Sequence, residues 1–489
     1  MTSVRGFQPI NFYTKPGTDY QLLPFRFTAL DDTRVVMTNM GGEFYITPRE
    51  SVTDLVHHRL DTDSQTYLDL RARGFLIDSK TKVALDTLPI KIRSRLSNLP
   101  VFTALHLFVV TLRCEHSCPY CQVSRQSESK LDFDMPQGVA DKAIDLMFKS
   151  PSKILKIEFQ GGEPLLNFPL IKYIVERCKA KNLEDSSRQL SFVITTNLAL
   201  ISDEIIDFCR INKIDISTSL DGPQDLHNKN RPRPGNNSYQ LTVEGINRLR
   251  KAMGPNCVSA LMTTTDRSLS RVKDIIDEYI NLGFNNIFLR ALSPHGFAIK
   301  TKAYQKYKND EWLDFYKQGL LYIIEINKKG FDFVESYAQI ILKKMLTFEP
   351  TGYVDLMSPA GAGIAAVVYN YDGDVYASDE SRMLAETGDK KFKLGNVLTD
   401  THESIFLGET LLDTVEETLA KSTPMCEECA FEDYCGADPV YHYATQGDIV
   451  GHKATSGFCS KNMGIFRFLL DLIDKDQEAY RIFRRWAVR

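Results

Sequence analysis

Strand-like and helix-like segments alternate through the middle of the chain. Short runs rich in β-branched and aromatic residues are typical of buried strands, and they occur at 104–113, 153–160, 190–196, 213–220, 258–265 and 285–290. Between and after them, apolar residues recur every three or four positions, as in amphipathic helices, at 138–149, 168–181, 202–211, 239–252, 268–283 and 311–329. Six successive strand–helix units predict a parallel sheet with right-handed crossovers. A complete barrel of this kind has eight units, so we expect an α/β fold with a partial (β/α)6 TIM-like barrel over residues 101–345.

The residues before this barrel show a different order of elements. Strand-like segments at 24–30 and 34–47 come first, and the second contains a hairpin turn at Asn39–Gly42. Helical patterns follow at 48–60 and 64–76. This order predicts a winged-helix-like module over residues 1–80, joined to the barrel by a linker over residues 81–100.

The residues after the barrel predict a third part, over 346–489. Short strands at 365–371 and 373–378, a turn at Asp372-Gly373 and several cysteines indicate a small metal-stabilised domain. The chain then closes with one amphipathic helix at 464–487.

Composition narrows the class of protein. The 489 residues include 59 Lys and Arg and 63 Asp and Glu, a net charge of -4, which argues against nucleic-acid binding by bulk electrostatics. No apolar run approaches the length of a transmembrane helix, and the first fifteen residues lack the apolar core of a signal peptide. We therefore expect a cytoplasmic protein without a membrane partner. In a reducing compartment its ten cysteines favour metal or redox chemistry over disulfides.

Seven of the cysteines fall into two clusters. The first cluster contains Cys114, Cys118 and Cys121, and the second contains Cys426, Cys429, Cys435 and Cys459. The isolated Cys178, Cys209 and Cys257 are typical of small buried hydrophobic side chains.

The first cluster has the spacing Cys-x3-Cys-x2-Cys directly after the first barrel strand. Three thiolates on a short loop can hold three irons of a [4Fe–4S] cluster, which leaves the fourth iron open to a small chelating molecule. A structural zinc site is the alternative, with His116 as a candidate fourth ligand.

Polar groups follow the next three predicted strands. They are Gly161-Gly162-Glu163-Pro164, Thr195-Thr196-Asn197 and Ser219-Leu220-Asp221-Gly222. The Glu163 carboxylate can accept a hydrogen bond from an ammonium group, and the other side chains suit a ribose and an amino-acid moiety. Each motif alone is common in ordinary turns, but α/β barrels place their active sites at this end of the strands.

Together these motifs resemble the radical S-adenosylmethionine (SAM) superfamily. The resemblance covers roughly residues 104–330 and implies that Cys114, Cys118 and Cys121 bind a [4Fe–4S] cluster whose open iron is chelated by SAM. It further implies reductive cleavage of SAM to a 5′-deoxyadenosyl radical that abstracts a hydrogen atom. The implied SAM-binding residues are Tyr120 beside the adenine, Gly162 and Glu163 at the amino group, and Asn197, Ser219 and Asp221 at the ribose or methionyl end.

The second cluster offers four thiolates, enough to close a site without a substrate. A zinc ribbon is one interpretation of Cys426, Cys429, Cys435 and Cys459. The spacing also resembles SPASM domains, the auxiliary-cluster domains of radical SAM peptide maturases, and matches the ligands of their outer cluster only. The usual inner-cluster positions hold no cysteine, since 358–363 has none and Ser378 and Pro439 stand at the others. The resemblance thus implies one auxiliary [4Fe–4S] cluster and two clusters in total.

Asp379 is the candidate catalytic residue. It follows Ser378, and in related sulfatase maturases the matching aspartate acts as a base on the substrate, so the resemblance implies the same role here. The alternative is a solvated carboxylate in a turn.

The resemblance also points to a class of substrate. The N-terminal module resembles domains that bind a leader peptide as an added strand, although a structural cap on the barrel is an alternative. The segments 105–126, 159–171 and 361–383 resemble the HxsB family, the radical SAM maturases of His-Xaa-Ser systems. This implies a substrate polypeptide with His-Xaa-Ser repeats, a companion radical SAM protein, a small partner protein and an electron donor such as flavodoxin or ferredoxin. A crosslink, an epimerisation and an oxidation all remain open.

Two other functions are compatible with the sequence. One is an anaerobic sulfatase-type maturase that makes formylglycine, which the missing inner-cluster cysteines disfavour. The other is a non-catalytic iron–sulfur or zinc scaffold that delivers a peptide, which the intact cysteine triad and Gly-Gly-Glu-Pro disfavour.

Overall fold

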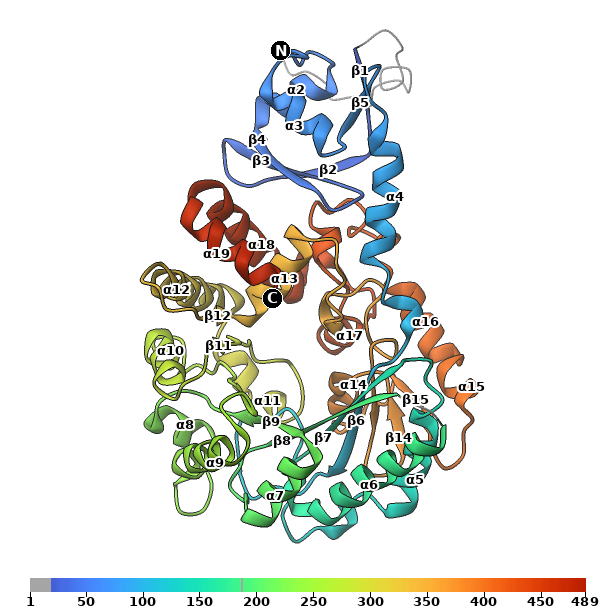
Figure 1. Ribbon diagram of the computed structural model, residues 1–489, viewed down its shortest axis with the longest axis vertical. Helices are drawn as coiled ribbons and strands as arrows, with labels where there is room; N and C mark the ends of the chain where they lie inside the picture. Colours follow the sequence, from blue (N-terminus) through green and yellow to red (C-terminus); the bar gives the residue numbers. More distant parts are fainter. Residues whose placement is uncertain (1–18, 186–187) are drawn as a thin grey trace. The chain divides into compact units, whose positions relative to one another are not determined.

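The chain folds into two compact units in the computed structural model, which describes residues 19–185 and 188–489 (Figure 1). The smaller unit contains the described residues up to Leu96 together with Glu428–Asp433, and the larger unit contains the described residues of Ser97–Glu427 and Tyr434–Arg489. The first fifteen residues, predicted to lack the apolar core of a signal peptide, lie outside the described residues.

The smaller unit contains the predicted hairpin and helices. Its three-stranded antiparallel sheet has the order β2-β3-β4, formed by Phe25–Ala29, Arg34–Asn39 and Phe44–Pro48. The helices are α2 (Arg49–Val56) and α3 (Gln65–Ala72), and the short strands β1 (Tyr20–Leu22) and β5 (Leu76–Asp78) pair antiparallel. Tyr20, Met37, Leu55 and Phe75 form part of its buried core, which the apolar positions of these elements supply.

Residues Val83–Arg95, within the predicted linker over 81–100, form helix α4, which the sequence patterns did not indicate. None of its residues is buried, so this helix lacks the apolar stripe that sequence periodicity detects. Polar contacts hold it instead: Lys91 Nζ lies 2.5 Å from Glu43 Oε1, and Arg95 Nε donates to the Gly41 carbonyl at 3.0 Å.

Segment 428–433 joins the smaller unit although it is distant in sequence. Thr38 Oγ1 donates to the Ala430 carbonyl at 2.7 Å, and Arg26 Nη1 lies 3.3 Å from Glu432 Oε2. The smaller unit is therefore completed by a segment that the sequence analysis assigned to the C-terminal part.

An eight-stranded sheet forms the centre of the larger unit. Its order is β10-β9-β8-β7-β6-β13-β14-β15. The strands are β6 (Leu105–Thr111), β7 (Ile154–Gly161), β8 (Gln189–Thr196), β9 (Ile214–Ser219), β10 (Val258–Leu261), β13 (Ala366–Tyr369), β14 (Asp374–Tyr376) and β15 (Lys393–Asn396). Strands β6 to β10 are all parallel, so the prediction of an α/β fold with consecutive parallel strands is confirmed.

The prediction of six strands in one parallel sheet is wrong at two places. The sixth strand, β11 (Asn286–Ile287), pairs with β12 (Val334–Glu335) in a separate two-stranded sheet, and its two residues offer too little backbone to extend the main sheet. Strand β13 pairs parallel with β6, and β14 and β15 continue the sheet antiparallel. All four residues of β13 are buried, which requires cover on both faces and explains why it joins the large sheet.

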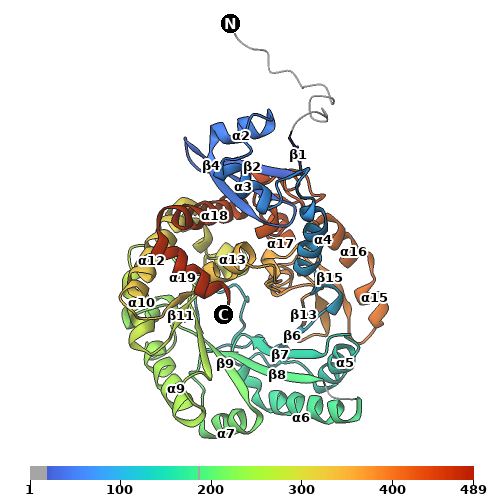
Figure 2. The same ribbon diagram turned by 45° about the horizontal axis from the view of Figure 1, so that its top comes forward.

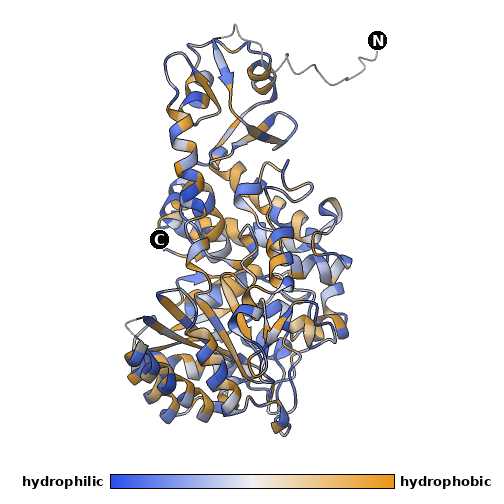
Figure 3. Cartoon of the chain, turned by 90° about the vertical axis from the view of Figure 1, so that its right-hand side faces the viewer, coloured by the Kyte–Doolittle hydropathy of each residue, from blue (hydrophilic) through white to orange (hydrophobic). Residues whose placement is uncertain are grey.

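The predicted helices α5, α6, α7, α9 and α10 lie on the outer side of this sheet (Figure 2). They are Gln137–Met147, Phe168–Asp185, Asp203–Asn212, Ser238–Met253 and Val272–Asn281. Helix α10 buries Val272, Ile275, Ile276 and Tyr279, which share one face at helical spacing. Figure 3 shows hydrophobic and hydrophilic stretches alternating along the helices of the chain.

The remaining helices complete the larger unit. They are α8 (Gln224–Asn230), α11 (Phe297–Lys300), α12 (Asn309–Lys328), α13 (Ser336–Leu346), α14 (Asp379–Ala385), α15 (His402–Phe406), α16 (Glu409–Glu417), α17 (Pro439–Gln446), α18 (Gly457–Lys475) and α19 (Gln477–Ala487). The single closing helix predicted at 464–487 is therefore wrong. The Asp476 carboxylate accepts the amides of Glu478 and Ala479 at 3.0 Å and caps a new helix there. Over the described part of the chain, no helix is long and apolar enough to cross a membrane.

Candidate active site at the carboxyl ends of the strands

The first cysteine cluster lies on the loop that follows β6. The Cys114 amide donates to the Gln126 carbonyl at 3.0 Å, and the Cys121 amide donates to the Cys118 carbonyl at 3.2 Å. These backbone bonds fold residues 114–126 into a compact loop. Its three cysteines are free thiols with intermediate exposure.

His116 is already held by protein partners. The ligand atoms of Cys114, Glu115 and His116 lie within 4.8 Å of one another, which alone would suit a metal ion. However, His116 Nδ1 lies 2.9 Å from Glu115 Oε1, and its Nε2 lies 2.7 Å from Ser238 Oγ. Both ring nitrogens therefore have hydrogen-bond partners, which disfavours His116 as the fourth ligand of a zinc ion.

The Gly161-Gly162 turn brings the end of β7 against the end of β6. A Cβ atom at Gly161 would lie 1.9 Å from the Thr111 carbonyl oxygen, and one at Gly162 would lie 2.3 Å from the Arg113 carbonyl oxygen. The next amide, that of Glu163, donates to the same Arg113 carbonyl at 2.7 Å. Only glycine allows this approach, so both glycines set the geometry beside the cysteine loop.

The Glu163 carboxylate is fully buried and fixed by three donors. Oε1 accepts from the Leu165 amide at 3.0 Å and from Thr196 Oγ1 at 2.6 Å, and Oε2 accepts from the Asn197 amide at 2.8 Å. Burial, followed by the nearby Glu115 carboxylate, raises the pKa of Glu163. Asn197 Nδ2 also donates to Glu115 Oε1 at 2.8 Å, so these contacts bring the ends of three neighbouring strands together.

Asp221 and Tyr120 form a second group in the same unit. Tyr120 Oη donates to Asp221 Oδ2 at 2.6 Å, and both side chains are buried. Arg231 Nε lies 3.1 Å from Asp221 Oδ2, and the guanidinium lies 5.5 Å from the centre of the Tyr120 ring. Burial would lower the pKa of Arg231, but Asp221 and Tyr120 outweigh it and raise this pKa.

Arg231 is a site residue that the sequence analysis did not find. Its only sequence signal is its spacing of four residues from His227, in the segment that follows Asp221. His227 Nε2 lies 3.0 Å from Ser238 Oγ, and the Asp221 amide donates to His227 Nδ1 at 3.3 Å. Because Ser238 also contacts His116, a buried chain of hydrogen bonds connects the cysteine loop with Asp221.

Within the described residues, two predicted site residues have hydrogen-bond or ion-pair partners outside these groups. Ser219 is the last residue of β9, where its backbone pairs with Leu261 of β10. Asp379 is the first residue of α14, and its Oδ1 lies 2.8 Å from Nη2 of the fully buried Arg382. Asp379 thus forms a local ion pair at the start of its helix.

The cysteines of the second cluster are distributed over both units. Cys426, Cys435 and Cys459 belong to the larger unit, and Cys429 belongs to segment 428–433 of the smaller unit. Lys344 Nζ donates to the Cys435 carbonyl at 2.9 Å, and the Cys459 amide donates to Ser456 Oγ at 3.3 Å. Their joint use as ligands stays a prediction.

A comparison of sequences identifies the central part of the larger unit. Residues 108–279 match the Radical SAM superfamily. Residues 108–279 form a radical SAM domain. This stretch contains the cysteine triad, the Gly-Gly-Glu-Pro turn and Asp221, so the predicted resemblance to the superfamily is confirmed.

The matches to related proteins cover different shares of the chain. An uncharacterized protein of Methanocaldococcus jannaschii is 31% identical over 39% of this chain, and the match spans 63% of that relative. The cysteine-type anaerobic sulfatase-maturating enzyme of Clostridium perfringens is 23% identical over 65% of this chain and 82% of its own length.

Two solved structures share the fold at low sequence identity. The chain of native anSMEcpe with bound AdoMet has a TM-score of 0.63 and 17% identity, over 78% of this chain and 99% of that chain. The Streptococcus suis SuiB structure with its precursor peptide SuiA has a TM-score of 0.52 and 13% identity, over 88% of this chain and 98% of that chain. The fold likeness therefore extends well beyond the radical SAM domain.

Proposed function

We propose that the chain is a radical SAM enzyme that modifies a ribosomally made peptide or protein. The observation that carries the proposal is the cysteine loop after β6, which lies against the glycine turn at the end of β7 within the radical SAM domain. Three free thiols on one short loop, beside a turn that admits no side chain, fit a [4Fe–4S] cluster on Cys114, Cys118 and Cys121 with SAM bound next to it. When bound, these cofactors supply a 5′-deoxyadenosyl radical that abstracts a hydrogen atom.

The residues around the loop position SAM in this proposal. Gly162 exposes backbone and Glu163 presents a carboxylate near the SAM amino group, with Asn197, Ser219 and Asp221 toward the ribose or methionyl end. The three donors that fix Glu163 keep its orientation constant before SAM arrives. Tyr120, near the adenine, is held in place by Asp221 and Arg231.

A peptide substrate is supported by the relatives and by the smaller unit. The SuiB structure contains its precursor peptide, and the names of the sulfatase-maturating enzymes state that they act on a protein. In the smaller unit, β2 and β4 are the outer strands of the three-stranded sheet, and Phe27 of β2 is 57% exposed. An outer strand can bind a leader peptide by strand addition. We propose a His-Xaa-Ser repeat polypeptide as the substrate, on the resemblance of the three segments described above.

The second cluster completes the proposal. One auxiliary [4Fe–4S] cluster would be held by Cys426, Cys429, Cys435 and Cys459. Flavodoxin or ferredoxin would be the electron donor. The protein partners would be the companion radical SAM protein and the small partner protein of the same system. Asp379 is the proposed base on the substrate. The sulfatase-maturase likeness favours formylglycine formation as the second candidate function.

Cleavage of SAM tests the central claim. The full chain is reconstituted anaerobically with iron and sulfide, and 5′-deoxyadenosine is measured after addition of SAM and dithionite. Cys118→Ala should abolish formation of 5′-deoxyadenosine, because the two remaining thiolates cannot hold a [4Fe–4S] cluster that needs three cysteine ligands. The matched control is Cys257→Ala, since Cys257 lies outside both clusters and is buried next to β10. Wild-type turnover in Cys118→Ala would refute the assigned role.

The product distinguishes the two candidate functions. Mass spectrometry of a co-expressed His-Xaa-Ser repeat peptide and of a sulfatase-derived Ser or Cys peptide would show which one changes mass. Modification of the sulfatase peptide alone, with conversion to formylglycine, would replace the first candidate by the second.

A further inference from the structure

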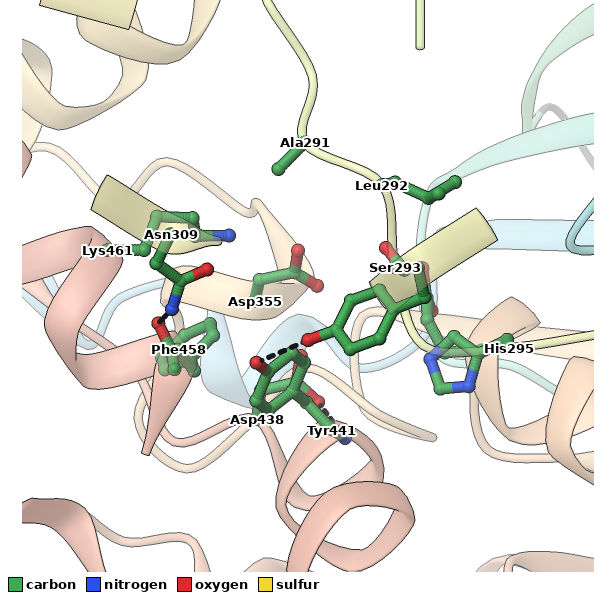
Figure 4. Close-up of a pocket in the computed structure, with 13 residues that line it drawn as sticks. Ala291, Leu292, Ser293, His295, Asn309, Asp355, Asp438, Tyr441, Phe458 and Lys461 are labelled. Atoms are coloured by element: carbon green, nitrogen blue, oxygen red, sulfur yellow. Dashed lines mark hydrogen bonds between the residues drawn. The ribbon is translucent and has the colours of Figure 1, made fainter. Parts of the chain in front are cut away.

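A polar pocket lies inside the larger unit (Figure 4). Its wall at 291–295 contacts the cysteine loop, because Gln122 Nε2 donates to the Ser293 carbonyl at 3.4 Å. Its walls come from the loop 291–295, the starts of α12 and α14, Asp355, and helices α17 and α18. Figure 4 shows Asp355, Asp438, Ser293 and His295 around this space. A role for this pocket in substrate binding rests on the proposed peptide-modifying function, because the pocket would take one part of such a substrate.

More carboxylate side chains than cationic side chains line the pocket. Asp355, Glu380 and Asp438 line it, and over the described part of the chain Lys461 is the single Lys or Arg that lines it. Lys461 Nζ lies over the rings of Tyr337 and Phe458, at 5.9 and 5.5 Å from their centres. Within the described residues, Asp355 and Asp438 have no ion pair within 4.0 Å, and Glu380 reaches Arg290 Nη2 only at 3.8 Å.

The ionisation of these groups reflects burial and mutual repulsion of the carboxylates. Burial, then Asp355 and Asp379, raises the pKa of Glu380, and Arg290 only partly offsets this rise. Burial, then Asp355, raises the pKa of Asp438, and Lys461 only partly offsets this rise. A carboxyl whose pKa is raised by neighbouring carboxylates ionises more readily when a cation binds between them.

His295 supplies an independent observation. Its side chain is 2% exposed and lines the pocket, and its Nδ1 has no hydrogen-bond partner among the described residues. Burial lowers the pKa of His295 to about 4, so the ring is neutral near pH 7 and Nδ1 can serve as acceptor or donor to a bound group. A buried ring nitrogen without a partner is costly unless a ligand satisfies it.

The spacing of the carboxylates favours an organic cation over a metal ion. Among the described residues, the group of metal-ligating side chains whose ligand atoms lie within 4.8 Å of one another is Cys114, Glu115 and His116, and the pocket carboxylates do not form such a group. An ammonium or guanidinium group can donate several hydrogen bonds to acceptors that are spread around a pocket.

We propose that this pocket binds a basic side chain of the substrate polypeptide, with Asp355, Glu380 and Asp438 as its counter-charges and His295 as an added hydrogen-bond partner. The pocket would fix the position of the peptide by charge as well as by shape. It places Glu380 against this basic side chain, whereas Asp379 does not line the pocket and is paired with Arg382.

Equilibrium dialysis of small probes tests the proposal without any need for catalysis. The reconstituted full chain is dialysed against N-acetyl-arginine methylamide and against its uncharged analogue N-acetyl-citrulline methylamide. We expect the arginine probe to bind at least about tenfold more tightly, and we expect high salt to weaken only the arginine probe.

Variants locate the binding. Glu380→Gln and Asp438→Asn should each weaken the arginine probe about fivefold or more, since each removes one counter-charge. Glu386→Gln is the matched control, because Glu386 caps the same helix α14 without lining the pocket. His295→Asn, which keeps a polar atom near the Nδ1 position, should bind better than His295→Phe. Iron content and circular dichroism verify that each variant is folded.

Several outcomes would overturn the proposal. They are equal binding of the two probes, tighter binding of N-acetyl-glutamate methylamide, unchanged binding in both carboxylate variants, and stoichiometric binding of Mn²⁺ that excludes the arginine probe. If a variant does not fold, the salt dependence of the wild-type chain still decides. Loss of 5′-deoxyadenosine formation with normal dialysis would refute the proposed function alone, whereas failed dialysis with normal SAM cleavage would refute only this inference.

Discussion

At the scale of single residues, two glycines show how local geometry shapes the site. A Cβ at Gly162 would lie 2.3 Å from the Arg113 carbonyl oxygen. This oxygen belongs to the backbone, so moving it away costs more free energy than moving a flexible side chain. We expect Gly162→Ala to destabilise the fold on the order of 1–3 kcal/mol and to lower the iron bound after reconstitution. Thermal unfolding and iron analysis measure both effects.

Gly138→Ala is the matched control for this substitution. Gly138 lies in the first turn of α5, and a Cβ there would meet nothing within 4 Å. Alanine should stabilise this helix by up to about 1 kcal/mol without changing the iron content. Equal effects of the two substitutions would contradict the geometric role of Gly162.

At the scale of elements, Asp78 ties the end of β5 to α3. Its Oδ2 accepts from Tyr67 Oη and Arg71 Nη1, both at 2.9 Å, and Oδ1 accepts from the amides of Lys80 and Thr81. Burial raises the pKa of Asp78, but these hydrogen bonds outweigh it and lower the pKa to about 2. The resulting stabilisation of about 2 kcal/mol is complete above pH 4 and is lost as the pH falls through 2.

Asp78→Asn should therefore loosen this part of the smaller unit at pH 7. Amide hydrogen exchange in residues 64–81 should become about thirtyfold faster, the factor that corresponds to about 2 kcal/mol. The difference from the wild type should shrink as the pH falls through 2, because Asp78 then becomes protonated in the folded chain as well as in the unfolded chain. Asp63→Asn, at an exposed position just before α3, is the control and should change the exchange little.

At the scale of the whole molecule, metal content tests the number of cofactor sites. Seven clustered cysteines, divided as three plus four, predict about eight irons per chain after reconstitution. The double variant Cys426→Ala and Cys429→Ala should retain about four irons, because the triad on the loop after β6 is intact. Iron and zinc analysis by mass spectrometry provides the measurement.

Buried cysteines outside the clusters provide the control for metal content. Cys178 in α6 and Cys209 in α7 are fully buried, and their alanine variants should keep all of the iron. About four irons with one zinc in the wild-type chain would instead indicate a zinc ribbon at the second cluster.

The sequence by itself determined the features that depend on neighbouring residues. Apolar periodicity indicated β6 to β10 and the helices between them, and the turn residues Asn39–Gly42 indicated the β3–β4 hairpin. The spacing of Cys114, Cys118 and Cys121 suggested the superfamily together with the motifs at the ends of the next three strands. Such signals are local, because strand and helix periods and loop spacing are written into consecutive residues.

The tertiary structure decided what depends on distant residues. His106 of β6 contacts Tyr369 of β13 across 263 positions, a pairing that no local pattern encodes. Likewise, Arg231 becomes a site residue only through its contact with Asp221 and Tyr120, and α4 forms without an apolar stripe because polar contacts hold it. Asp355, Glu380, Asp438 and His295 come from four separate segments and meet only in the folded chain. Strand partners and buried charges are selected by packing and by compensation of charge among segments far apart in the chain, so the sequence pattern could not specify them.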